Sequence, residues 1–218
     1  MSKKQRDVEK LYKNINIGII ALLFVMLFIE LLLQRWMMMF VTLLAVILIG
    51  FLLYFQKRIN ITLPPELNLI IVVFIIAGIV LGEIHDFYDR FIWWDSVLHT
   101  ISGFIISTLA FGLLYVLYKN KKLIAPPSLI VFLSFSIAMT MGVFWEIFEF
   151  FMDQTFGLNM QRAETGVVDT MQDFIENMIG ATVASILGYL YLKEGDSFIY
   201  RRLVKHFEKK NKHLFEEK

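Results

Sequence analysis

Six long apolar runs, separated by short polar segments, account for most of this chain. A transmembrane helix needs about 20 predominantly apolar residues to cross the hydrocarbon core of a bilayer. The pattern therefore predicts an all-α, polytopic membrane helix bundle with six transmembrane helices. The expected spans are residues 15–33, 36–55, 67–82, 95–118, 129–152 and 169–192.

Polar segments mark the loops and termini that separate these runs. The pairs Pro64-Pro65 and Pro126-Pro127 mark two loops, because proline interrupts a helix. The basic segment 1–14 resembles the start of a signal peptide, but no small-x-small cleavage site follows the first run, so a retained anchor is expected. We predict a cytoplasmic N-terminus over 1–14, a transmembrane domain over 15–192 and a basic cytoplasmic tail over 193–218.

The composition agrees with a membrane protein. Hydrophobic residues make up 57% of the chain and the mean hydropathy is +0.63, whereas a soluble domain needs a charged surface. The chain has no cysteine, which excludes disulfides and thiolate metal sites. Its basic residues lie in loops and termini without a soluble domain to present them, so nucleic-acid binding is not indicated.

Lysine and arginine are distributed unevenly between the two sides of the predicted bundle. With six spans, 18 of the 21 basic residues fall on the side of both termini, and 3 fall on the other side. Short loops rich in Lys and Arg stay in the cytoplasm, so both termini are predicted to be cytoplasmic. For the tail, two interpretations stay open: an amphipathic helix on the anionic inner leaflet, or a solvated tail.

One apolar run contains acids that lipid does not tolerate. In GVFWEIFEFFMD, residues 142–153, the acids Glu146, Glu149 and Asp153 fall within roughly 60° of one another on a helix that turns about 100° per residue. An ionised side chain in a bilayer costs about 2.5–3.5 kcal/mol, so this stripe needs partners, protons or a cation. It is the strongest indication of a functional site in the sequence.

Two other spans carry polar stripes at the same predicted, extracytoplasmic side. Asp95 and His99 open the fourth span, and Asp169, Asp173 and Asn177 open the sixth. Residues spaced by four lie on one face of a helix, so each span offers a narrow stripe. Three stripes at one depth predict a single shared pocket.

The donor atoms of this pocket are mostly oxygens, which suit Mg²⁺, Mn²⁺ or Ca²⁺, while His99 with fewer acids would suit Zn²⁺ or Fe²⁺. Without a metal, carboxylates this crowded would share protons, which allows general acid/base chemistry or proton relay. The predicted metal ligands are His99, Glu146, Glu149 and Asp173, the predicted catalytic residues are His99 and Glu146, and the predicted supporting residues are Asp95, Asp153, Asp169 and Asn177.

A structural role is the competing interpretation of these acids. Acids at span ends can face water, and buried acids can bind neighbouring helices by hydrogen bonds. This interpretation is favoured for Asp153 and Asp169, which lie at span boundaries. Arg162 lies in the outer connection and is expected to pair with the acidic pocket, and Glu30, near the outer end of the first span, is expected at the membrane interface.

Three motifs, WWDSVLHTISGF, FWEIFEF and DTMQDFIENMIGA, resemble the YjdF-type family of bacterial inner-membrane proteins. More distantly, Asp95-xxx-His99, Glu146 and Asp173-xxx-Asn177-xx-Gly180 are similar to the VanZ-like family, which is associated with low-level teicoplanin resistance. That family usually has Gln where this chain has Glu149. The resemblance implies a multi-pass protein of the bacterial cytoplasmic membrane with a shared polar site, and it supplies no substrate.

The leading functional hypothesis is an outward-facing acid/His pocket that binds a divalent cation and, through it, an envelope lipid or lipid-linked headgroup. Its catalytic form is metal-assisted hydrolysis or transfer. A proton- or ion-coupled transporter would use the same carboxylates, although related halves and charges at mid-depth are not evident in the sequence. A non-catalytic scaffold would instead bind another membrane protein through the small-residue ridge Gly180, Ala184 and Gly188, for which packing is the preferred explanation.

Overall fold

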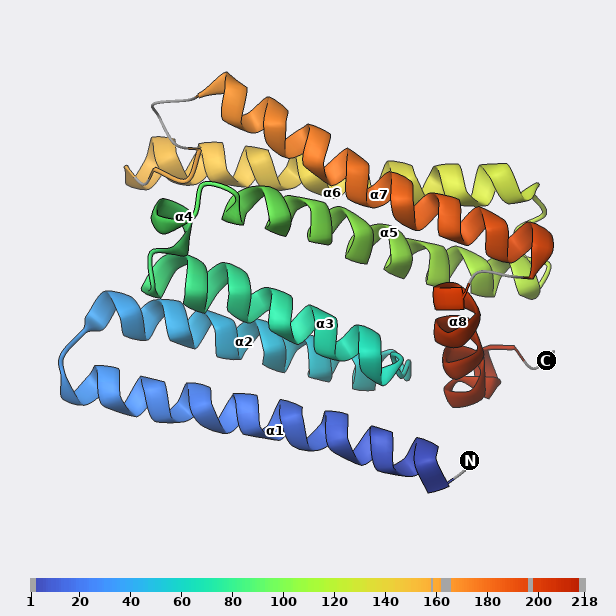
Figure 1. Cartoon of the computed structure of the whole chain (residues 1–218), viewed down its shortest axis with the longest axis horizontal. Helices are drawn as coiled ribbons and strands as arrows, with labels where there is room; N and C mark the ends of the chain where they lie inside the picture. The colour runs from blue at the N-terminus through green and yellow to red at the C-terminus, as the bar shows by residue number, and fades with distance from the viewer. Residues whose placement is uncertain (1–2, 158, 162–165, 196–197, 216–218) are drawn as a thin grey trace. The chain divides into compact units, whose positions relative to one another are not determined.

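The computed structural model describes residues 3–157, 159–161, 166–195 and 198–215 (Figure 1). The described residues form helices and contain no strand, and, as predicted, six helical segments are long and apolar enough to span a membrane. The helices are α1 (Lys3–Leu32), α2 (Trp36–Arg58), α3 (Pro65–Ile76), which continues as a π-helix (Ala77–Ile84), α4 (Phe87–Arg90), α5 (Trp94–Lys119), α6 (Pro127–Phe156), α7 (Val167–Glu194) and α8 (Phe198–Lys210), followed by a 3-10 helix (Lys212–Leu214).

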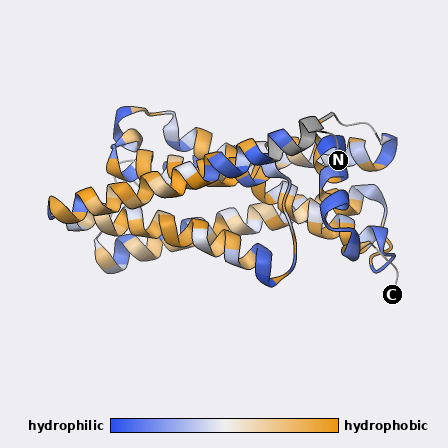
Figure 2. Cartoon of the chain, turned by 90° about the horizontal axis from the view of Figure 1, so that it is seen from below, coloured by the Kyte–Doolittle hydropathy of each residue, from blue (hydrophilic) through white to orange (hydrophobic). Residues whose placement is uncertain are grey.

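The long helices expose most of their apolar side chains. The most apolar stretch of each is only 11% to 39% buried within the protein. Figure 2 shows hydrophobic residues along almost the whole length of these helices, with hydrophilic residues gathered towards helix ends. An apolar surface of this extent is what a lipid environment requires and water does not tolerate.

Prolines and glycines set several helix ends. Helices α3 and α6 begin at Pro65 and Pro127, a position where the fixed φ of proline suits a helix and its missing N–H is not needed. Helices α6 and α7 end at Gly157 and Gly195, whose φ of 65° and 66° lies in the left-handed region that glycine adopts without strain. Helix α6 therefore extends beyond the apolar run 129–152 at both ends.

Contacts divide the chain into two compact units. Unit 1 comprises residues 1–92 and 209–211, and unit 2 comprises residues 93–208 and 212–218. Each unit contains three of the long helical segments: α1, α2 and α3 with its π-helix in unit 1, and α5, α6 and α7 in unit 2. All the predicted ligands belong to unit 2.

Unit 1 has an apolar core with one buried acid. The core residues are Leu23, Ala45, Ile49, Val72 and Val80. Glu30, near the end of α1, is only 6% exposed and accepts a hydrogen bond of 2.9 Å from the Thr42 hydroxyl of α2. At the other end of the unit, the buried Asn211 amide donates to the Thr62 carbonyl and accepts from the Thr62 N–H, at 2.8 Å and 2.7 Å.

Unit 2 is built on close contact between α5 and α7. A methyl group on Gly180 would meet the Thr100 carbonyl oxygen and the Phe104 nitrogen of α5, so this position accommodates only glycine without a shift of backbone. Further along α7, Gly188 packs against Phe111 and Val131. The small-residue ridge is therefore used for packing within unit 2, and it is not a free surface on which a scaffold could bind a partner.

This packing predicts that Gly180→Ala destabilises the protein by about 1–3 kcal/mol, the usual cost of overpacking a close contact. The expected result is a lower midpoint of thermal unfolding in detergent. Gly112→Ala on α5 is the matched control, because a methyl group there meets no atom within 4 Å. Since alanine favours the helix, the control should unfold at the same temperature or slightly above, and equal losses in both variants would contradict the prediction.

Helix α8 packs against α5 and α6 through its apolar side. Tyr200 is 1% exposed and its hydroxyl hydrogen-bonds with that of Thr108 at 3.0 Å, and this burial raises the pKa of the Tyr200 phenol. The Tyr115 hydroxyl donates to Glu208 at 2.7 Å. The residues around this contact are Phe111, Leu114, Tyr115, Ile130, Tyr200 and Val204. Neither open interpretation of the tail included this docking.

Candidate metal centre

Three helices of unit 2 bring five predicted site residues together. Helices α5 and α7 begin at the end of the unit where α6 finishes, so the first turns of two helices meet the later turns of the third (Figure 1). Asp173 lies six residues into α7, about 9 Å along the helix axis. The five residues are Asp95 and His99 of α5, Glu146 and Glu149 of α6, and Asp173 of α7.

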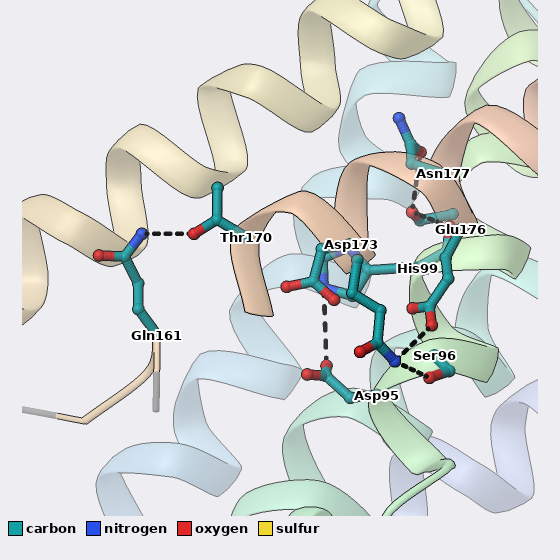
Figure 3. Close-up of polar contacts among 10 residues, drawn as sticks. Asp95, Ser96, His99, Gln161, Thr170, Asp173, Glu176 and Asn177 are labelled. Atoms are coloured by element: carbon teal, nitrogen blue, oxygen red, sulfur yellow. Dashed lines mark hydrogen bonds and ion pairs between the residues drawn. The ribbon is translucent and has the colours of Figure 1, made fainter. Parts of the chain in front are cut away.

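His99 joins two of the acids. Its Nε2 atom lies 3.5 Å from Oδ1 of Asp95 and 3.7 Å from Oδ1 of Asp173. Figure 3 shows these three side chains close together. The exposed fractions of the three side chains are 11% for His99, 18% for Asp95 and 6% for Asp173. One ligand atom from each of the three residues lies within 4.8 Å of the other two.

The acids of α6 form a second group with the same aspartate. One carboxylate oxygen from each of Glu146, Glu149 and Asp173 lies within 4.8 Å of the other two, and all three residues are buried. Two oxygens that share one ion lie at most twice the metal–oxygen distance apart, roughly 4.2 Å for Mg²⁺ and 5.2 Å for Ca²⁺. The 4.8 Å limit that both groups meet lies between these two values, so both are close to the dimensions of a divalent cation site.

Glu146 is the least satisfied member of the cluster. It is 4% exposed, and neither carboxylate oxygen has a hydrogen-bond partner among the described residues. Thr170 and Gln161 lie near it, and the Gln161 amide donates a hydrogen bond of 3.3 Å to the Thr170 hydroxyl (Figure 3). A buried, unbonded acid is costly, so its retention needs a reason beyond packing.

Asn177, predicted as a supporting residue, lies one turn beyond Asp173 on α7. Its Nδ2 donates to the Ala138 carbonyl of α6 at 3.2 Å, and the Ser102 hydroxyl of α5 donates to its Oδ1 at 3.4 Å. The absence of side chains at Gly103 and Gly142 leaves the space that Asn177 occupies. Asn177 therefore joins three helices beside the cluster.

The remaining predicted residues lie outside the two groups. Asp153 accepts hydrogen bonds from the backbone N–H groups of Met160 and Gln161, at 2.8 Å and 3.0 Å, and so holds the start of the connection to α7. Asp169 is half-buried in the first turn of α7 and lies close enough to Glu146 for their charges to interact. Arg162, expected to pair with the acids, lies outside the described residues.

The structure adds polar neighbours that sequence reasoning missed. The Gln172 amide donates to Oε1 of Glu176 at 3.0 Å and to the Ser96 hydroxyl of α5 at 3.4 Å (Figure 3). Both Ser96 and Gln172 directly adjoin predicted site acids in the sequence, which was the available signal. The contact between Gln172 and Ser96 links α7 to α5 beside the cluster.

Four carboxylates and one imidazole in this space are suited to binding cations. At short range the like charges repel, and the surrounding apolar helices screen this repulsion poorly. A divalent ion coordinated by several oxygens would relieve it for all of them at once. An imidazole that contacts two acids is also a candidate for proton transfer to a bound group.

These features define a multi-pass membrane protein with a buried acid/His cluster. The chain belongs to the family described as predicted membrane protein (DUF2238), whose model matches residues 14–194. A relative described as an uncharacterized protein of Thermotoga maritima is 27% identical over 148 residues, which cover 67% of this chain and 73% of the relative. No solved structure matches the chain. The family match names neither the YjdF-type nor the VanZ-like family, so both resemblances stay predictions.

Proposed function

We propose that the cluster binds a divalent cation and that the cation holds the anionic headgroup of an envelope lipid or lipid-linked molecule. The observation that carries this proposal is Glu146, a buried acid without a hydrogen-bond partner among the described residues. Its carboxylate lies within 4.8 Å of those of Glu149 and Asp173. A divalent cation would satisfy three such oxygens together.

The position of the cluster favours a headgroup as the second ligand. His99 and Asp173 lie five and six residues from the starts of α5 and α7, about 8–9 Å along the helix axes, so the cluster is closer to one end of unit 2 than to its middle. Acids alone would repel a phosphate, whereas an ion that keeps free coordination positions binds phosphate oxygens. The distribution of basic residues supports an extracytoplasmic location of this end, with both termini in the bacterial cytoplasm.

Purified full-length protein is therefore expected to retain a divalent metal. Protein purified in mild detergent without chelator would be assayed by mass spectrometry for Mg, Mn, Ca and Zn. The double variant Glu146→Gln, Asp173→Asn should lose the metal, because it removes one ligand charge from α6 and one from α7. Glu194→Gln is the matched control, since this exposed acid is at the opposite end of α7. Metal-free wild-type protein of unchanged stability would contradict the proposal.

The headgroup part of the proposal has its own test. Short-chain phosphatidic acid in detergent micelles is expected to bind the Mg²⁺-loaded protein and to be released by a chelator. A neutral lipid of the same chain length is the control for non-specific uptake into the micelle. Binding of both lipids to the same extent, with or without Mg²⁺, would contradict headgroup binding through the cation and would leave the proposed cation site unaffected.

The catalytic form of the proposal is metal-assisted hydrolysis or transfer at the bound headgroup. His99 and Glu146 are the candidates for acid/base roles, and Glu149 and Asp173 for metal ligands. Transport by the same carboxylates predicts a different result, namely flux into proteoliposomes driven by a proton or sodium gradient. Cation-dependent headgroup binding without such flux would favour the proposal over the transporter.

A further inference from the structure

Asp173 belongs to two groups of ligand atoms at the same time. Its carboxylate lies with Asp95 and His99 of α5 in one group, and with Glu146 and Glu149 of α6 in the other. The ligand atoms within each group are mutually within 4.8 Å, but the five residues do not form a single group of this kind. Oxygens on one ion of the size of Mg²⁺ lie at most roughly 4.2 Å apart, so one such ion does not reach all five residues.

The charge of the cluster also exceeds what one ion neutralises. Asp95, Glu146, Glu149 and Asp173 are four carboxyl groups, so one divalent cation balances two of them, and the other two need protons or a second cation. Uncompensated charge between apolar helices is strongly unfavourable. Two divalent cations would balance the four carboxylates while His99 stays neutral and acts as a nitrogen ligand.

We propose that unit 2 forms a two-ion centre in which the Asp173 carboxylate bridges the ions. Asp95 and His99 complete the first site, and Glu146 and Glu149 complete the second. This inference rests on the proposed cation binding and adds its stoichiometry, its bridge and the class of group that it accepts. Carboxylate-bridged ions about 3.5–4 Å apart bind a phosphate ester by one oxygen each, so a phosphorylated headgroup is the ligand class.

The two sites differ in their donors and hence in their metal preference. The first contains an imidazole and suits Mn²⁺ or Zn²⁺, whereas the second is entirely oxygen and suits Mg²⁺, Ca²⁺ or Mn²⁺. Both carboxylate oxygens of Glu146 are buried and have no hydrogen-bond partner among the described residues, which indicates that the second site binds a ligand. Mn²⁺ fits both sites and is paramagnetic, so it is the probe of choice.

The test is Mn²⁺ binding to the full-length chain in detergent, measured by equilibrium dialysis and electron paramagnetic resonance. Wild-type protein and the Glu194→Gln control are expected to bind two ions per chain and to give the spectrum of an exchange-coupled pair. His99→Ala and Glu149→Gln should each leave one ion with the spectrum of isolated Mn²⁺. The double variant Glu146→Gln, Asp173→Asn should bind no ion. The single variant Asp173→Asn should lose the exchange coupling between the two ions.

Other results would contradict the two-ion centre, the cation binding, or both. If a single variant elutes as an aggregate, Asp95→Asn replaces His99→Ala and Glu146→Gln replaces Glu149→Gln, with the same expected counts. One uncoupled ion per wild-type chain, lost from every ligand variant, would overturn the two-ion centre and leave the proposed cation binding intact. No bound ion in folded wild-type protein would overturn both.

Discussion

Glu146→Gln is expected to stabilise the metal-free protein and to abolish its stabilisation by Mg²⁺. Without metal, the substitution keeps the shape of a side chain that is 4% exposed and removes a charge that has no hydrogen-bond partner among the described residues. At pH 8.5, in the presence of a chelator, we expect the free energy of unfolding to rise by about 1–3 kcal/mol, because a buried unpaired charge costs more than a neutral amide in the same place.

With Mg²⁺, wild type is expected to be more stable than Glu146→Gln. A ligand at 100 times its dissociation constant stabilises the state that binds it by about 2.7 kcal/mol, and only protein with an intact site gains this. The measurement is the unfolding midpoint with and without Mg²⁺ for wild type, Glu146→Gln and Glu194→Gln. The last variant should behave like wild type under both conditions.

A structural acid would give the opposite pattern. If Glu146 served only as a hydrogen-bond acceptor between helices, glutamine would lower stability in the chelator, and Mg²⁺ would change wild type and variant equally. A reversal of sign between the two conditions is therefore specific to a cation site, and general damage to the bundle does not produce it.

The fold was predictable because a bilayer imposes strong rules on sequence. Six apolar runs of sufficient length specify six membrane-spanning helices, and Pro65 and Pro127 mark where two of them begin. The convergence of His99, Glu146 and Asp173 was also predictable, since a polar stripe in a lipid-facing helix must turn towards another polar stripe. Neither rule depends on side-chain detail.

The rest depended on which atoms meet, and helical spacing does not reveal this. Asn177 shares the polar stripe of Asp173 but points at the Ala138 carbonyl, because Gly103 and Gly142 open a space there. Glu30 accepts a hydrogen bond from Thr42 of the next helix. The hydropathy pattern locates the turn between the two helices but does not show which of their side chains meet. The docking of α8 likewise follows from the fit of Tyr200 among aromatic residues of unit 2.

Asn177→Leu is expected to destabilise unit 2 by about 2–4 kcal/mol, the largest structural effect of any substitution near the cluster. Leucine loses the hydrogen bonds to Ala138 and from Ser102, each worth about 1 kcal/mol or less in a membrane protein. Its methyl groups must also fit where Asn177 is 1% exposed and lies against Gly103 and Gly142, so overpacking adds to the loss.

The measurement separates positioning from ligation. In the presence of a chelator, Asn177→Leu should unfold well below wild type, whereas Met178→Leu, at an adjacent position that is 42% exposed, should not. Affinity for Mn²⁺ should fall in the same variant, because α5, α6 and α7 no longer hold the ligand atoms of His99, Glu149 and Asp173 at their distances. A variant of normal stability in the chelator that has nevertheless lost Mn²⁺ would instead make Asn177 a metal ligand, since only a ligand affects the metal-bound state alone.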